Sequence, residues 1–399
     1  MKRTGADLVV RALEDEGVPF TFGIPGTHNI ELYDALAASE RVRPILVTDE
    51  QGAGFMADAV WRASGRLGCA NLVPGAGLTH ALSGIAEAWM DNVPMLVLGC
   101  GIRRDTGAAY QLHDIDQLAI ARPVTKAAIR AERGEEVYAT IRRACRLARD
   151  GVPGPVMVEV PADVYLFRHE GALPEPDPAP APRAPAAAEL ERALGVLRGA
   201  RRPLLYVGHG ARGAAARVRE LAERLEAPVA TTIHGKGVVP ERHPLWLWPG
   251  FGDAAPPFVR QVVAGCDATL AIGCRFGEVA TGSYGLTPPG PLVHVDIDPA
   301  VPNRNFPAAA AVTADAAVAV DALLAALEPR PRDEALRERI RAGHAGVEAA
   351  WRAAEGGAGV TPGRLLRELQ ERLGADTIFT ADSGNGTFLA MEHLRLDEP

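Results

Sequence analysis

The sequence predicts an α/β protein with two doubly wound, mostly parallel sheet domains, followed by the first elements of a third α/β domain. Three observations predict this class. Apolar runs of strand length alternate with helical segments through most of the chain. Several runs are apolar at every position, which is typical of strands covered by helices on both faces. A segment in which Pro recurs at every second or third position separates two such series.

The first domain, expected over residues 1–168, alternates helices and strands. Apolar side chains recur at helical spacing in segments 6–17, 28–36, 50–63, 78–90 and 135–149. Strand-length apolar runs occur at 19–23, 43–48, 68–73, 94–99 and 154–161. Because helices connect most of these strands, the strands should run parallel, with their carboxyl ends at one edge of the sheet.

The alternation restarts after a Pro/Ala-rich linker, expected over residues 169–188. A central Rossmann-like domain is expected over 189–328, with a helix at 213–226 and strands within "RPLLYVG", "APVATT", "DATLAIGC" and "PLVHVDIDP". Residues 329–399 should then supply helical segments at 333–355 and 361–373. The segment "DTIFTADSGNG" that follows is expected to be the opening strand and turn of a truncated third domain.

Composition excludes several classes of partner. The net charge of −8 offers no basic footprint for nucleic acid or an anionic membrane. No apolar run approaches the roughly 20 residues that span a bilayer. The five cysteines form no C-x-x-C pair, so we expect reduced, buried thiols in a cytoplasmic protein.

A glycine pattern in the second domain is typical of nucleotide binding. Gly208, Gly210 and Gly213 form G-x-G-x-x-G between a strand and a helix, where a pyrophosphate could approach the helix N-terminus. The acid expected about 20 residues later is missing, since that position reads Thr-Thr-Ile-His. Asp296 and Asp298 follow a later strand. A plain tight turn and a site for FAD or ADP therefore both remain open, and so does a dinucleotide-dependent oxidoreductase.

Glu50 follows an apolar strand and begins a helix of small residues. An acid in a first helical turn commonly serves only as a partner for the helix dipole. Two glycine turns, however, also follow strands of the same domain. The residues of these turns are Gly23, Pro25 and Gly26 in the first and Gly75 and Gly77 in the second. All should share the carboxyl edge of the sheet, where backbone can approach a flat ligand.

Several blocks, in order, give the chain a specific family resemblance. "FGIPG", "DEQGAGFMADAVWRASG", "PGAGLTHALSGIAEAWMDNVPMLVLGC" and "RPVTK" resemble the pyrimidine-binding domain of thiamine-diphosphate-dependent 2-keto acid enzymes. "GKG", "LAIGCRF" and "HVDIDP" are similar to the family's central domain, and "TADSGNG" to the start of its diphosphate-binding domain. Within the family, the chain most resembles the large subunit of acetolactate synthase.

The resemblance implies roles for the residues of the first domain. Glu50 would hold the pyrimidine ring nitrogen of thiamine diphosphate and so activate the cofactor. The family commonly has His before this Glu; here Asp49 stands there, and its side chain should point away from that of Glu50. His80 stands where an Asn is usual. On the substrate side we expect His113 or, with a two-residue shift, Gln111, and we favour His113; His28 lies on the same predicted edge.

The sequence contains fewer of the residues that bind the diphosphate end of the cofactor in this family. In the family, Mg²⁺ is bound by a Gly-Asp-Gly block and a later Asn, which this sequence lacks. We therefore expect no metal ligand in this chain, and Mg²⁺ held by residues outside it. The turn Ser383, Gly384, Asn385 and Gly386 could offer backbone N–H groups to phosphate.

The implied function is decarboxylation of a pyruvate-like 2-keto acid with carboligation to a second carbonyl compound. A non-oxidative decarboxylase of the same family is the nearest alternative. A non-catalytic or split-subunit binding protein is the alternative from another class. The family's site lies between chains, so the resemblance implies a homodimer or tetramer, with a separate chain as another source of the diphosphate domain.

Overall fold

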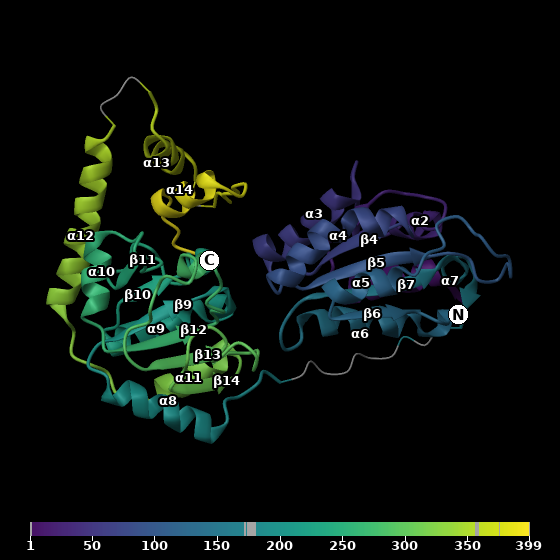
Figure 1. Cartoon of the computed structure of the whole chain (residues 1–399). Helices are drawn as coiled ribbons and strands as arrows, with labels where there is room; N and C mark the ends of the chain where they lie inside the picture. The colour runs from purple at the N-terminus through teal and green to yellow at the C-terminus, as the bar shows by residue number, and fades with distance from the viewer. Residues whose placement is uncertain (1, 171–172, 174–180, 356–358, 375, 399) are drawn as a thin grey trace. The chain divides into compact units, whose positions relative to one another are not determined.

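The computed structural model describes residues 2–170, 173, 181–355, 359–374 and 376–398. Contacts divide the chain into two compact units, Met1–Pro180 and Ala181–Pro399 (Figure 1). Residues 171–172 and 174–180 of the expected linker lie outside the described residues, and α8 (Ala187–Gly199) already begins inside its expected range. The finer division, with a third domain beginning within 329–399, stays a prediction.

The first unit is built on a parallel six-stranded sheet in the order β3-β2-β4-β5-β7-β6. Its strands are β2 (Phe20–Gly23), β3 (Arg43–Leu46), β4 (Gly68–Leu72), β5 (Met95–Gly101), β6 (Ala127–Arg130) and β7 (Pro155–Pro161). Every residue of β4, β5 and β7 is buried. The apolar runs are thus explained by helices on both faces, and the predicted parallel α/β class is confirmed.

Helices cover the two faces of this sheet in separate groups (Figure 1). One apolar cluster contains residues of α1 (Gly5–Asp15), α2 (Ile30–Ala37), α6 (Val137–Arg149) and α7 (Ala162–Leu166). The opposite cluster contains residues of α3 (Glu50–Ser64), α4 (Ala76–Met90) and α5 (Gln117–Ala121). Two short strands of this unit, β1 (Arg3–Thr4) and β8 (Arg168–His169), form a separate antiparallel pair.

The second unit holds another parallel six-stranded sheet, in the order β11-β10-β9-β12-β13-β14. Its strands are β9 (Pro203–Val207), β10 (Val229–Thr231), β11 (Trp246–Pro249), β12 (Ala268–Ile272), β13 (Leu292–Asp296) and β14 (Ala310–Thr313). Relative to chain order this is 3-2-1-4-5-6, a doubly wound order that agrees with the expected Rossmann-like domain. The helices α9 (Ala215–Leu225), α10 (Pro257–Ala264) and α11 (Ala316–Ala326) join α8 around it.

Two expected elements of this unit differ in the structure. The helix expected from residue 213 begins only at Ala215, because a 3-10 segment over His209–Ala214 occupies the glycine-rich turn. The strand expected in "DTIFT" is wrong: residues 376–380 have no strand assignment, and Ile378 is 69% exposed. A strand needs a hydrogen-bonded neighbour, and the described part of the chain supplies none for this segment.

The end of the second unit is helical. It consists of α12 (Glu334–Ala353), α13 (Pro362–Arg372) and α14 (Asn385–His393). All five cysteines are buried and unpaired, as expected. Among the helices described, none has the length and hydropathy needed to cross a bilayer.

His344 of α12 gives this unit a predicted sensitivity to acid. Its ring stacks on Trp246 at 5.2 Å, and its Nε2 lies 3.2 Å from the Trp246 carbonyl oxygen. Burial lowers the pKa of His344 to about 4, whereas an unfolded His titrates near 6.5. The fold therefore favours the neutral ring. Its contribution is complete above about pH 6.5 and is lost as the pH falls toward 4, by up to about 3 kcal/mol.

We expect the free energy of unfolding, measured by urea titration at successive pH values, to fall across this window in the wild-type protein. His344→Gln keeps a donor for the Trp246 carbonyl but does not titrate. In this variant the slope of the unfolding free energy against pH should be smaller, by the amount that corresponds to the uptake of about one proton on unfolding. Equal slopes for both proteins would contradict the assignment.

Candidate functional site

Glu50 is the first residue of α3, at the carboxyl edge of the first sheet. The helix begins here because Asp49 adopts extended backbone angles and its side chain accepts a hydrogen bond from the Gln51 amide at 2.8 Å. The Glu50 side chain is only 13% exposed. The carboxyl group is thus kept largely away from water at a helix N-terminus, where its charge is also favoured.

The two expected glycine turns lie at the point where the strand order of the sheet reverses. β2 and β4 are neighbours although β3 comes between them in the chain, and ligands bind outside the carboxyl ends of strands at such a point. β2 leads into the turn at Pro25 and Gly26, and β4 leads into the turn at Gly75. A Cβ atom at Gly77 would lie 3.4 Å from Glu50 Oε1. The second turn and the carboxyl group are therefore direct neighbours.

Small residues on α3 and α4 bring these features together. A Cβ atom on Gly54 would lie 3.1 Å from the Gly84 Cα, and one on Gly84 would lie 2.5 Å from the Phe55 backbone nitrogen. Only glycines allow the two helices to approach so closely. Since both helices begin at the carboxyl edge of the sheet, this packing holds Glu50 beside Gly77.

Two of the expected histidines form a pair at the same edge. The rings of His28 and His113 lie 5.5 Å apart, and neither Nδ1 atom, though buried, has a hydrogen-bond partner among the described residues. His113 has a positive φ of 66°, and its Cβ lies 3.3 Å from the position that a Cβ of Gly75 would occupy. Burial and the neighbouring His113 lower the pKa of His28. Gln111 instead donates to the Ala108 carbonyl within its own loop.

Asp49 does not point away from Glu50 as expected. One ligand atom from each of Asp49, Glu50 and His80 lies within 4.8 Å of the others, and His80 Nδ1 is 3.7 Å from Glu50 Oε2. The expectation was wrong because β3 ends at Leu46, so that Asp49 is the N-cap of α3 rather than a strand residue. Both carboxylates and an exposed His80 therefore surround the mouth of the site.

Tyr33 and Asn71 lie close to the first glycine turn, and neither was predicted as a site residue. The Tyr33 hydroxyl lies 3.1 Å from the position that a Cβ of Gly23 would occupy, and burial raises its pKa. Asn71 is fully buried, yet both polar atoms of its amide lack a partner at normal hydrogen-bond geometry among the described residues. Such atoms normally meet a water or a ligand group. An Asn within the apolar run "CANLV" was the available signal.

The remaining candidates lie in the second unit. A Cβ at Gly208 would lie 2.2 Å from the Gly273 carbonyl oxygen, so the close approach of the two backbone segments explains why a glycine stands at this position. A Cβ at Gly213 would meet only open space. Asp296 is buried at the end of β13, and burial raises its pKa to about 6; its carboxylate accepts from the Asp298 amide. Ser383 and Gly384 form an exposed turn before α14, which begins at Asn385 and Gly386.

The residues of the first unit fit the pyrimidine half of thiamine diphosphate. The glycine turns leave backbone where any side chain would clash, as at Gly26, whose Cβ would lie 2.7 Å from Val73 Cγ1. Glu50 offers a shielded carboxyl group beside them, and the unpartnered nitrogens of His28 and His113 supply hydrogen-bonding capacity. A flat heterocycle with a ring nitrogen suits this arrangement of groups.

Comparison with known proteins identifies the family of the chain. The family model described as the N-terminal TPP binding domain of thiamine pyrophosphate enzymes matches residues 3–120, and that of their central domain matches residues 190–323. The chain belongs to the thiamine pyrophosphate enzyme family.

The chain is similar over most of its length to several individual members of this family. The chain is 32% identical over 334 residues to acetolactate synthase isozyme 1 large subunit of Escherichia coli, a match covering 83% of this chain and 59% of that protein. It is 33% identical over 407 residues to the acetolactate synthase large subunit of Parasynechococcus marenigrum, covering 98% and 65%. It is 34% identical over 361 residues to a probable 2-ketoarginine decarboxylase of Pseudomonas aeruginosa, covering 87% and 63%. The chain thus spans about three fifths to two thirds of the length of these relatives.

Proposed function

We propose that this chain takes part in thiamine-diphosphate-dependent decarboxylation of a 2-keto acid such as pyruvate, followed by carboligation to a second carbonyl compound. The observation that carries the proposal is the shielded carboxyl group of Glu50 next to Gly77, at the reversal point of a parallel sheet. The likeness to acetolactate synthase large subunits supports the same reaction class.

The roles of the chain's own residues follow from their positions. When bound, thiamine diphosphate supplies the carbanion that adds to a 2-keto acid and accepts the electrons released with carbon dioxide. Glu50 would hold a proton at the ring nitrogen of the pyrimidine. Gly23, Pro25, Gly26, Gly75 and Gly77 would shape the pocket by leaving backbone exposed to the flat ring.

His113 and His28 would face the substrate side, where an imidazole can move a proton near neutral pH. Burial and the neighbouring His113 lower the pKa of His28, which favours the neutral form of its ring. We propose His80, beside Glu50, as a further proton donor or acceptor. Gln111 keeps the role of a substrate contact only if its loop rearranges, because its amide donates within the loop.

Decarboxylation without carboligation is the second candidate. The 34% identity to a probable 2-ketoarginine decarboxylase specifically favours it, and both reactions share the steps up to loss of carbon dioxide. The acceptor substrate is what separates the two.

The other partners are proposals of the same kind. We propose that Mg²⁺ is bound by ligands outside this chain, that the turn Ser383–Gly386 contacts phosphate, and that the protein is a cytoplasmic homodimer or tetramer. A separate chain supplying the diphosphate-binding domain is the alternative source of those ligands. We further propose FAD or ADP as a ligand beside Gly208, Gly210 and Asp296. The close packing of Gly208 on Gly273 explains that glycine without any bound nucleotide.

The test is a calorimetric titration of thiamine diphosphate and Mg²⁺ into the chain, alone and mixed with a diphosphate-binding domain from a relative. We expect saturable binding in the mixture and release of carbon dioxide from pyruvate or another 2-keto acid. No binding and no release in either sample would refute the proposal. Tight stoichiometric binding of NAD or FAD in their place would favour an oxidoreductase.

A further inference from the structure

The loop 102–116, which carries His113, connects β5 to α5 and has no regular structure of its own. Apolar burial does little to fix it, because Tyr110 is fully exposed and Leu112 is 65% exposed. Positive φ angles at Tyr110 and His113 add backbone strain. Contacts elsewhere must therefore hold His113 against Gly75, since a loop with few buried apolar contacts otherwise opens readily.

Gln117, the first residue of α5, joins the two ends of this loop. Its side-chain amide nitrogen donates to the Cys100 carbonyl at 2.7 Å and to Glu159 Oε2 at 2.8 Å. Cys100 lies just before the loop and Gln117 just after it, so the first hydrogen bond closes the neck of the loop. Both neighbours are acceptors, which fixes the orientation of the amide. Gln117 is 2% exposed, so water does not compete for these bonds.

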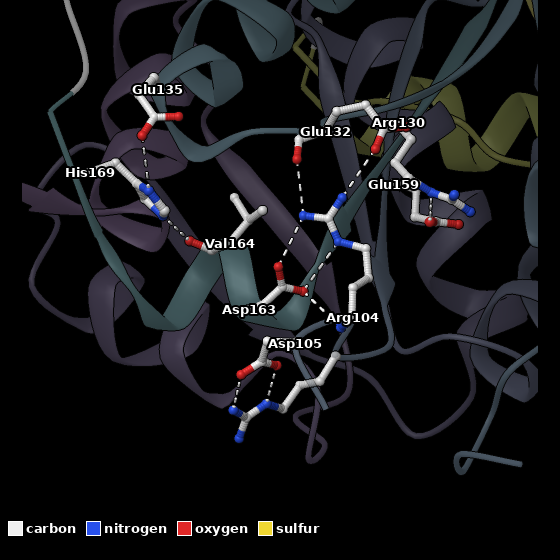
Figure 2. A network of polar contacts seen from close by, with 10 residues as sticks. Arg104, Asp105, Arg130, Glu132, Glu135, Glu159, Asp163, Val164 and His169 are labelled. Atoms are coloured by element: carbon white, nitrogen blue, oxygen red, sulfur yellow. Dashed lines mark hydrogen bonds and ion pairs between the residues drawn. The ribbon is translucent and has the colours of Figure 1, made fainter. Parts of the chain in front are cut away.

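Glu159 connects this neck to the rigid sheet. It lies on β7 and is 5% exposed, and its second carboxylate oxygen accepts from Arg130 at the end of β6 (Figure 2). A buried carboxylate needs such donors, because an unpaired buried charge is strongly unfavourable. Gln117 and Arg130 each satisfy one oxygen. The neck is therefore fastened to two strands of the parallel sheet by charge-assisted bonds, which are stronger than neutral ones.

A second anchor holds the beginning of the loop. The Arg104 guanidinium lies between Asp163 of α7 and Glu132, with Nη2 2.9 Å from Asp163 Oδ2 and Nη1 3.1 Å from Glu132 Oε2 (Figure 2). The Arg104 backbone amide also donates to Asp163 at 3.1 Å. These contacts leave the stretch 105–116 to project from two fixed points.

We propose that Gln117 is a positioning residue: together with Glu159 and Arg130 it closes the neck of the loop 102–116 and so holds His113 beside Gly75 and His28. The catalytic meaning of that placement rests on the proposed function, but the placement itself is testable without cofactor or substrate. Gln117 touches none of the proposed reacting groups and acts only through the loop.

The test is amide hydrogen exchange of the unliganded chain, read by mass spectrometry, in wild type and Gln117→Leu. The substitution keeps the buried volume and removes both hydrogen bonds. We expect exchange in residues 105–116 to accelerate about fivefold or more, while β4, β5 and β7 change by less than about twofold. Arg103→Gln is the matched control, because it breaks the exposed Arg103–Asp105 pair of the same loop without touching the neck, and it should leave exchange unchanged.

A second readout follows His28. Burial and the nearby His113 lower the pKa of His28, so release of the loop, which exposes His28 and removes His113, should raise that pKa toward its usual value in an NMR titration of Gln117→Leu. Should this variant not fold, Gln117→Asn is polar but one methylene shorter, cannot reach both acceptors, and should show the same changes.

Unchanged exchange in 105–116 together with an unchanged His28 titration would overturn the inference, as would equal acceleration in the strands. Neither readout depends on turnover. Failure to bind thiamine diphosphate even with a diphosphate-binding domain supplied, together with the expected exchange, would refute the proposed function and leave the positioning role intact.

Discussion

Glu50→Gln should slow exchange of the thiamine diphosphate C2 proton about 10²–10⁴-fold, the usual loss when a proton-transfer group is removed. Gln has nearly the same shape as Glu, but its amide cannot hold or release the proton that the pyrimidine nitrogen requires. The exchange is measured by NMR in deuterium oxide, with a diphosphate-binding domain supplied. Because the side chain is 13% exposed and Gln fits its space, the free energy of unfolding should change by less than about 1 kcal/mol.

Asp49→Asn is the matched control for this substitution. It removes the neighbouring carboxylate, yet Asn caps a helix as well as Asp, so α3 should still begin at Glu50. We expect at most about a tenfold effect on C2 exchange, since Asp49 is exposed and water screens its charge even at the short distance from Glu50. Wild-type exchange in Glu50→Gln, or equal losses in both variants, would remove Glu50 from its assigned role.

Much of the fold could be predicted from the sequence because central strands such as β4, β5 and β7 are buried on two faces. Such strands are almost entirely apolar, so their existence is visible without knowledge of their neighbours, whereas β6, β11 and β14 were not predicted. The expected strand 43–48 became Arg43–Leu46 and the expected helix 50–63 became Glu50–Ser64, which differ only at their ends. The helix was delimited by side-chain chemistry, with Asp49 at its start and Gly65 at its end.

Features that depend on distant partners could not be predicted in this way. The strand expected in "DTIFT" has the right composition, but pairing decides whether a strand forms, and the described part of the chain offers no neighbour. The proximity of Asp49 to Glu50 depended on where β3 ends, which a hydrophobic pattern does not determine to within two residues. Gln117 forms hydrogen bonds with Cys100, which is 17 positions away in the sequence, and with Glu159, which is 42 positions away. No local sequence pattern indicates such contacts.

Lys236→Met should be the most destabilising single substitution considered, at about 3–5 kcal/mol. Lys236 Nζ lies 2.7 and 2.8 Å from the two carboxylate oxygens of Glu241, and the side chains are 7% and 0% exposed. Burial lowers the pKa of Lys236 and raises that of Glu241, while the attraction between them opposes both shifts. Removal of the ammonium group would leave a carboxylate in the interior, with the Leu396 amide as its one remaining hydrogen-bond donor among the described residues.

The same ammonium group also holds the end of the unit, because it donates to the carbonyl oxygens of Met391 at 2.8 Å and Leu394 at 3.1 Å. We therefore expect Lys236→Met to increase amide exchange in 385–398 before global unfolding, and to lower the urea midpoint. Arg341→Gln, which breaks the exposed pair with Glu338, should cost less than about 1 kcal/mol.

The double variant Lys236→Met, Glu241→Leu distinguishes the effect of an unpaired buried carboxylate from the effect of the missing hydrogen bonds to the two carbonyls. If the carboxylate causes most of the damage, the double variant should recover at least half of the stability that the single variant loses, because replacing both charges with apolar groups removes the desolvation cost. If the carbonyls of Met391 and Leu394 matter more, the double variant should be no more stable than the single one, and residues 385–398 should stay loosened in both. A single variant as stable as wild type would mean that the ion pair contributes nothing to the packing of this segment.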